Sequence, residues 1–133
     1  MGKDLQVAML EDDSDDRYLT EETLGSLGFK FQIRFYTRSD ELFASLQQTK
    51  PNLLLVDYNS TPENAVGVLR RLKLNEAYRS IPVVVLCDSH HPKYHAECYA
   101  EGASSVVIKP RTLEETKKKI KSFFTYWMEV AES

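Results

Sequence analysis

The stretch Pro51-Asn52-Leu53-Leu54-Leu55-Val56-Asp57 contains four consecutive apolar residues that end abruptly in an acid. A short continuous apolar run bounded by turn-forming residues is typical of a strand that is buried on both faces, as in a parallel sheet. Asp57 then stands at the carboxyl end of the strand. We therefore expect a parallel α/β architecture with a carboxylate at one edge of its sheet.

Two other apolar runs also end in charged residues. The first run is followed by Glu11-Asp12-Asp13, and the last by Lys109-Pro110. Because parallel strands expose their carboxyl ends on one edge, these side chains and Asp57 should converge in one crevice. Carboxylates suit a hard divalent cation, and an ammonium neutralises charge that the metal leaves. Aspartate can form an acyl phosphate, so Asp57 is the candidate nucleophile.

The whole chain alternates short apolar runs with longer amphipathic ones, the rhythm of a doubly wound α/β sheet. The strands are expected at residues 5–10, 31–36, 53–57, 82–87 and 105–108. The helices are expected at about 15–27, from Ser39, at 64–74, at 92–101 and from near Thr112. Gly28 and Gly102 follow the first and fourth helices as C-terminal caps. The pattern predicts five parallel strands between two helical layers, a three-layer αβα domain.

Composition narrows the class of protein. The chain has 133 residues, 42% of them hydrophobic, which suits one globular domain. Its 17 basic and 20 acidic residues leave a net charge of −3, which argues against a general nucleic-acid binder. It contains neither an apolar stretch of about 20 residues nor a leader-like start, so we expect a cytoplasmic protein. Cys87 and Cys98 are expected to be reduced thiols.

Four pieces of sequence in this order resemble the receiver domain of two-component response regulators. They are Val7-Ala8-Met9-Leu10-Glu11-Asp12, Pro51 to Asp57, Ile81-Pro82-Val83-Val84-Val85-Leu86, and Glu101-Gly102-Ala103 running to Ile108-Lys109-Pro110. The resemblance covers nearly the whole chain. It implies the CheY-like, flavodoxin-like (βα)5 fold.

The resemblance also implies roles for individual residues. Glu11, Asp12 and Asp57 would hold Mg²⁺ together with the backbone carbonyl of Asn59. Asp57 would accept the phosphoryl group, and Lys109 would pair with Asp57 and then with a phosphoryl oxygen. In the family the peptide bond from this lysine to the following proline is cis.

Simpler explanations exist for the same residues. Glu11, Asp12 and Asp13 would also suit a solvated loop that caps the first helix, where acids favour the positive end. Asp57 alone would suit a turn, and Lys109 alone a surface lysine. Their coincidence favours the functional interpretation, with Asp13 ranked below Glu11 and Asp12 because the family tolerates many residues there.

The chain departs from the family pattern where receivers switch conformation. Cys87 replaces the usual Thr or Ser, and a thiol is a weak hydrogen-bond donor. Val106 stands where an aromatic residue often changes rotamer. Asp88 adds a charge where the family prefers a small neutral residue, and the loop 60–65 lacks the usual Pro at 61 and Asp-Gly at 64 and 65. We expect phosphorylation chemistry to be intact and its readout to be altered.

The favoured function is a stand-alone receiver of 133 residues that takes a phosphoryl group from a sensor histidine kinase or a phosphotransfer protein. It would signal by binding a downstream protein, without contact to DNA or a membrane. Its only catalysis would be self-phosphorylation and autodephosphorylation. The alternative is a degenerate receiver that serves as a phosphorylation-independent scaffold. A flavin binder is disfavoured by the acids after the first strand, and an aspartyl phosphatase by Asn59, which stands where a second acid is required.

Two further clusters remain as hypotheses. His91, His95 and Cys98 have a spacing that would bring imidazoles and a thiolate near one helix face, as in zinc sites. The simpler explanation is that the histidines lie in a loop and at the surface while Cys98 packs in the core.

The C-terminal segment carries the other hypothesis. Basic residues among apolar ones favour a partner surface; they are Lys117, Lys118, Lys119 and Lys121. The segment Tyr126-Trp127-Met128-Glu129-Val130 extends the last helix. It resembles the tail of stand-alone receivers associated with bacterial phytochrome kinases, where it pairs two copies. A homodimer through this C-terminal face is therefore a candidate assembly.

Overall fold

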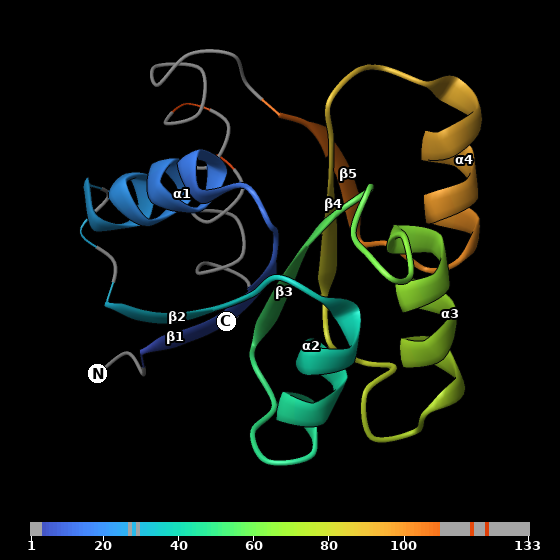
Figure 1. Cartoon of the computed structure of the whole chain (residues 1–133), viewed down its shortest axis with the longest axis horizontal. Helices are drawn as coiled ribbons and strands as arrows, with labels where there is room; N and C mark the ends of the chain where they lie inside the picture. The colour runs from blue at the N-terminus through green and yellow to red at the C-terminus, as the bar shows by residue number, and fades with distance from the viewer. Residues whose placement is uncertain (1–3, 27, 29, 110–117, 119–121, 123–133) are drawn as a thin grey trace.

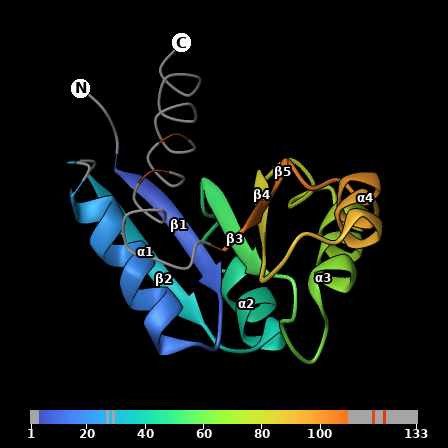
Figure 2. The ribbon, with the colours of Figure 1, turned by 90° about the horizontal axis from the view of Figure 1, so that it is seen from above.

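The computed structural model describes residues 4–26, 28, 30–109, 118 and 122. Five parallel strands form one sheet: β1 (Leu5–Leu10), β2 (Phe31–Tyr36), β3 (Leu53–Asp57), β4 (Val83–Cys87) and β5 (Ser105–Ile108). Their order across the sheet is β2-β1-β3-β4-β5, and Figure 2 shows them side by side in this order. Four described helices connect them: α1 (Ser14–Ser26), α2 (Ser39–Leu46), α3 (Ala65–Leu74) and α4 (Pro92–Ala100). The flavodoxin-like fold expected from the sequence is confirmed (Figure 1).

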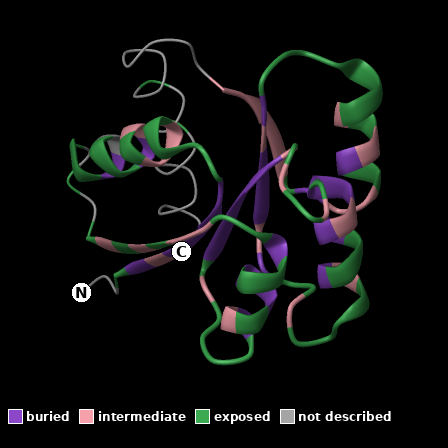
Figure 3. Ribbon diagram, in the orientation of Figure 1, coloured by how far each residue is buried: buried purple, intermediate pink, exposed green. Residues whose placement is uncertain are grey.

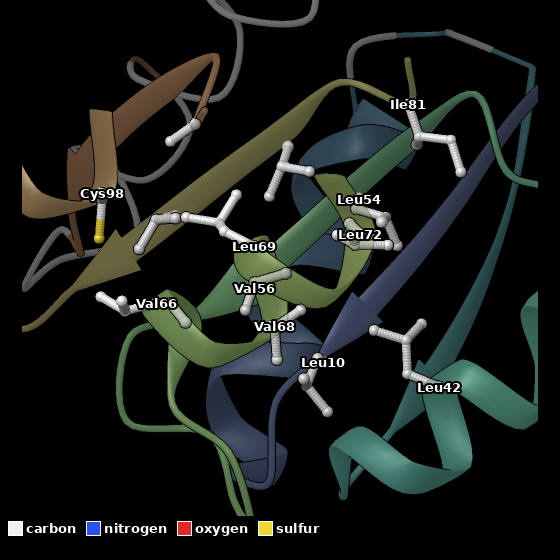
Figure 4. Packing of buried hydrophobic residues seen from close by; sticks show 14 of the residues in the cluster. Leu10, Leu42, Leu54, Val56, Val66, Val68, Leu69, Leu72, Ile81 and Cys98 are labelled. Atoms are coloured by element: carbon white, nitrogen blue, oxygen red, sulfur yellow. The ribbon is translucent and has the colours of Figure 1, made fainter. Parts of the chain in front are cut away.

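The two faces of the sheet carry separate hydrophobic clusters because successive side chains of a strand point to opposite faces. On one face Leu54 and Val56 pack with residues of α2, α3 and α4 (Figure 4). On the other face Leu53 and Leu55 pack with Leu24 of α1. The whole of β3 is buried between these clusters, which explains its uninterrupted apolar sequence (Figure 3).

Residues with special backbone requirements end the helices. Gly28 follows α1 with φ 76°, and Gly102 follows α4 with φ 104°. At the second site the Gly102 N–H donates to the Tyr99 carbonyl, and the Ala103 N–H donates to the Cys98 carbonyl. These two bonds form a Schellman motif, which needs a left-handed residue at its centre.

Element boundaries differ from the sequence expectations by single residues. β4 begins at Val83 because Pro82 has no N–H, although its carbonyl accepts from Leu54. α3 begins at Ala65, since Asn64 is its N-cap and accepts from the Gly67 N–H. α4 ends at Ala100, and Glu101 caps it. The predicted last helix lies outside the described residues except at Lys118 and Ser122, which are helical and exposed.

Candidate functional site

The sheet register places the candidate residues in one row. Leu10 is paired with Val56, Asp57 with Leu86, and Cys87 with Ile108. Each strand therefore ends at about the same level, and the residues that follow emerge at one edge. Glu11, Asp57, Asp88 and Lys109 come together there, as the sequence predicts.

Lys109 is the centre of the charge cluster. Its Nζ lies 2.7 Å from Glu11 Oε1, 2.9 Å from Asp16 Oδ2, 3.3 Å from Asp57 Oδ1 and 3.7 Å from Asp88 Oδ1. Burial lowers the pKa of Lys109, but the surrounding carboxylates and the hydrogen bond to Asp16 outweigh burial and raise that pKa well above its usual range. The ammonium is therefore charged at every pH at which the protein would work.

Glu11 is the most buried acid of the site, with a side chain that is 0% exposed. Burial, aided by the charge of Asp57 and opposed by Lys109, raises the pKa of Glu11 to about 8. Neither carboxylate oxygen has a hydrogen-bond partner of good geometry among the described residues, although Oε1 lies close to the lysine. The carboxyl group therefore keeps acceptor capacity that a further ligand, such as a cation, could use.

The acids fit a divalent metal. Carboxylate oxygens of Glu11, Asp12 and Asp57 all lie within 4.8 Å of one another. Glu11 and Asp57 are buried, whereas Asp12 is exposed, so the group opens to solvent on one side. Magnesium is bound in proteins by one or two carboxylates while it keeps several waters, and this donor set suits that mode.

Asp13 has a structural role. Its Oδ1 accepts hydrogen bonds from the backbone N–H groups of Asp15 and Asp16, at 2.8 and 3.1 Å. It is therefore the N-cap of α1, where a carboxylate satisfies free backbone donors. The lower rank given to Asp13 in the sequence analysis agrees with this geometry.

The sequence analysis missed Asp16. It lies in the first turn of α1 and accepts a hydrogen bond from the Lys109 ammonium at 2.9 Å. The one available signal was that Asp16 lies in the first turn of the helix that directly follows the acids Glu11 to Asp13.

Asn59 and Asp88 lie at the mouth of the crevice. The Asn59 backbone N–H donates to Asp57 Oδ1 at 3.4 Å, and its Nδ2 donates to Asp88 Oδ2 at 3.5 Å. Asp88 is largely exposed, with 69% of its side chain in solvent. The sequence analysis placed this extra negative charge near the site, and the structure brings it to Lys109.

The two switch positions have different environments. Cys87 is buried, and burial together with the charges of Asp57 and Asp88 raises the pKa of its thiol. Val106 is half-buried and packs against the main core cluster. Its backbone N–H donates to the hydroxyl of Tyr99 at 3.1 Å, a contact between α4 and β5 that the sequence did not suggest.

An aromatic stack connects the loop after Asp57 to α4. The ring of Tyr58, directly after Asp57, stacks on Tyr94 with centroids 5.0 Å apart. Tyr94 in turn stacks on His91 at 4.4 Å. Contacts of this type contribute about 0.5–1.5 kcal/mol beyond burial.

The structure does not assemble the hypothetical zinc set. His91 faces Tyr94, His95 contacts His90 edge-on at 4.8 Å, and Cys98 is fully buried in the core. Within the part of the chain that the structure describes, the acidic group at Glu11 is the one cluster of three or more metal-binding side chains.

Comparison with known protein families shows to which family the chain belongs. The model of the response regulator receiver domain matches residues 7–121. The chain belongs to the response regulator receiver family. Receiver domains are signalling domains rather than ordinary enzymes, they interact with histidine kinases or phosphotransfer proteins, and they bind Mg²⁺ at an acidic pocket.

Individual relatives agree with this membership. Response regulator Rcp1 of Synechocystis sp. is 27% identical over 130 residues, which cover 92% of this chain and 88% of Rcp1. The crystal structure of the Mn²⁺-bound form of Rcp1 superposes with a TM-score of 0.85 at 26% identity, covering 94% of this chain and 95% of that one. The phosphorylated cyanobacterial phytochrome response regulator RcpA has the same fold, with a TM-score of 0.89 at 22% identity and 96% coverage of both chains.

The resemblance to receiver domains is thereby confirmed, and the chain is similar over nearly its whole length to Rcp1 and to the phytochrome response regulator RcpA. Among the described residues no helix is both long and apolar enough to span a membrane. Several expectations lie outside the described residues: the conformation of the Lys109–Pro110 bond, the extended last helix, most of its lysine run, and the aromatic tail at 126–130.

Proposed function

We propose that this receiver accepts a phosphoryl group on Asp57 from a sensor histidine kinase or a phosphotransfer protein, with Mg²⁺ at Glu11, Asp12, Asp57 and the Asn59 carbonyl. One observation carries the proposal. The half-buried Lys109 ammonium lies 3.3 Å from the Asp57 carboxylate, beside three acids whose oxygens are grouped closely enough for one metal ion.

The chemistry follows from these positions. A carboxylate oxygen of Asp57 attacks the phosphorus of the donor, and the bond from phosphorus to the donor nitrogen breaks as the new P–O bond forms. Mg²⁺, when bound, neutralises charge on the transferred group. The Lys109 ammonium and the Asn59 N–H, which already contact Asp57, stabilise the equatorial oxygens. Such transfer depends mainly on positioning and electrostatics.

The proposal extends to the cellular role. The chain acts in the cytoplasm as a single receiver domain and passes its signal by binding a downstream protein, with neither DNA nor a membrane as partner. The C-terminal face provides a homodimer surface. Similarity to Rcp1 and RcpA supports a partner kinase of the phytochrome type.

A scaffold that binds partners without phosphorylation is the second candidate. Cys87 and Val106 favour it, because a buried thiol and a small aliphatic side chain replace the usual switch pair. The complete set of acids and the lysine beside Asp57 favour the phosphorylation cycle.

Incubation with Mg²⁺ and acetyl phosphate, followed by intact-mass measurement, separates the two candidates. The phosphorylation cycle predicts one added phosphoryl group, which is lost in Asp57→Asn. An Asp88→Asn variant is the matched control, since it removes a neighbouring carboxylate but keeps the acceptor. An unmodified wild type under excess donor would support the scaffold.

A further inference from the structure

The Lys109 ammonium has more acceptors than donors. It carries three N–H groups. Four carboxylates lie within 4.0 Å of its Nζ: Glu11 after β1, Asp16 in α1, Asp57 at the end of β3 and Asp88 after β4. A phosphoryl group on Asp57 would bring further acceptor oxygens to the same three donors. A phosphoryl oxygen can therefore accept a hydrogen bond from Lys109 only if one of the four carboxylates gives up its own contact with the ammonium.

Asp16 holds the ammonium most effectively among the acids outside the metal group. Its Oδ2 accepts a hydrogen bond of good geometry at 2.9 Å, whereas the shorter approach of Glu11 Oε1 lacks that geometry. The side chain of Asp16 is 31% exposed, so solvent screens the pair only in part. Asp88 is more distant and largely exposed, which makes it the weaker competitor.

Metal binding does not remove this competition. A cation at Glu11, Asp12 and Asp57 neutralises the acids that it contacts and weakens their attraction for Lys109. Asp16 is not part of that group, so the cation would not weaken its attraction for Lys109 in the same way. With a cation bound, the pair with Asp16 would therefore be the strongest of these attractions and would draw the ammonium toward α1.

We propose that Asp16 is a positioning residue that holds the Lys109 ammonium on the α1 side of the crevice and thereby lowers the affinity of the site for a phosphoryl group on Asp57. The proposal rests on the function proposed above. Its consequence is that the phosphorylated state is less favourable in this chain than the acids and the lysine alone would make it.

Beryllofluoride tests the proposal at equilibrium, because it binds an aspartate carboxylate as a phosphoryl mimic. Its affinity for the full chain with saturating Mg²⁺ is measured by calorimetry in wild type, Asp16→Asn, Asp16→Glu and Asp15→Asn. Asp15 is the matched control, since it is an exposed acid of the same helical turn without an ion pair to Lys109 among the described contacts. Thermal melting checks that each variant is folded.

Asp16→Asn is expected to bind beryllofluoride about threefold more tightly, the effect of losing one partly exposed ion pair. Asp16→Glu, which restores a carboxylate, should return toward the wild-type affinity, and Asp15→Asn should match wild type. The difference should persist in about 1 M salt, where charges farther apart than about 3 Å are screened.

Several results would overturn the proposal. If Asp15→Asn binds beryllofluoride as much more tightly as Asp16→Asn does, the effect comes only from the lower negative charge near the site. If Asp16→Asn binds beryllofluoride more weakly than wild type, Asp16 instead positions the lysine for the phosphoryl group. Suppose that wild type binds beryllofluoride and takes a phosphoryl group, but Asp16→Asn and Asp15→Asn have the same affinity for beryllofluoride. That result overturns this inference and leaves the proposed function intact. A wild type that does neither overturns the proposed function and this inference with it.

Discussion

The Nζ atom of Lys109 lies 2.7 Å from Oε1 of Glu11, an acid with no solvent exposure. The lysine is thus the counter-ion of a buried carboxyl group whose pKa is raised to about 8. Near neutral pH a proton, the ammonium and a divalent cation all compete for the same carboxylate, so occupancy of the site depends on pH.

The first prediction concerns this competition. Folding raises the pKa of Glu11 from 4.5 to about 8, so between these values the metal-free fold holds a proton that the unfolded chain has lost. The stability that this gives is fully present below the unfolded pKa and is lost as the pH rises to about 8. Mg²⁺ needs the carboxylate and displaces the proton. We expect the affinity for Mg²⁺ to rise from pH 6 to about pH 8, with proton release measured by calorimetry in buffers of different ionisation enthalpy.

Glu11→Gln is the control for the pH dependence, because it keeps the shape of the side chain without titrating. Its weaker Mg²⁺ binding should vary little over the same range. Binding by wild type at pH 7 without proton release would contradict the assigned role of Glu11.

The second prediction places the metal. A ligand that binds only the folded state raises its stability, so Mg²⁺ should raise the melting temperature of wild type. Glu11→Ala with Asp12→Ala should abolish that shift, because both side chains belong to the metal group. The shift is measured against the metal-free melting temperature of each variant, because the loss of two clustered acids itself changes that temperature.

Asp13→Ala separates the metal from the neighbouring helix cap. Loss of the cap should lower the free energy of unfolding by about 1 kcal/mol, while the Mg²⁺-dependent shift remains. A shift that survives in the Glu11/Asp12 double variant would place the metal elsewhere.

The third prediction concerns the switch. A hydrogen bond to a charged group contributes about 1.5–3 kcal/mol, and a thiol at position 87 supplies little of it. Phosphorylated wild type should therefore change its amide exchange across residues 88–108 less than phosphorylated Cys87→Thr does. Cys87→Ser is a second variant with a hydroxyl and should behave like Cys87→Thr.

An equal or larger change in wild type would point to another route between the site and α4. The stack of Tyr58 on Tyr94 connects the residue after Asp57 to that helix. Tyr94→Ala would then reduce the response, whereas Tyr94→Phe, which keeps the ring, would preserve it.

The fourth prediction compares two glycines. Gly102 has φ 104°, and a Cβ there would lie 2.5 Å from Cε of Lys73. Gly102→Ala should therefore lower the free energy of unfolding by about 1–2 kcal/mol. Gly25 is helical, and an added Cβ would meet no atom within 4 Å apart from its chain neighbours and its own helix backbone, so Gly25→Ala should raise stability by up to about 1 kcal/mol. Denaturant unfolding measures the free energy of unfolding of both variants. A change of the same sign and size in the two would contradict the prediction.

The sequence predicted the strands well because their signals are local. Leu53 to Val56 form an apolar run bounded by turn residues, and the register of a parallel sheet then determines which strand ends meet. Asp57 and Lys109 could be placed together on that basis alone. Pro82 was assigned to a strand because the pattern of apolar residues does not show that proline lacks a backbone N–H.

Contacts that depend on the packing of helices could not be predicted in the same way. The stack of Tyr58 on Tyr94 and the bond from Val106 to Tyr99 depend on how α4 packs, which no short motif encodes. Asp16 was overlooked because its partner Lys109 is 93 residues away along the chain. The burial of Glu11 that raises its pKa is likewise a property of the folded sheet.

The most direct test of the central claim is the position of the phosphoryl group. Wild type treated with Mg²⁺ and acetyl phosphate is reduced with borohydride, which converts an aspartyl phosphate to homoserine, and its peptides are sequenced by mass spectrometry. The account predicts one hydroxylamine-labile group per chain, a homoserine at position 57 only, and no label without Mg²⁺. A homoserine at Asp12, Asp16 or Asp88, or equal labelling of Asp57→Asn, would contradict it.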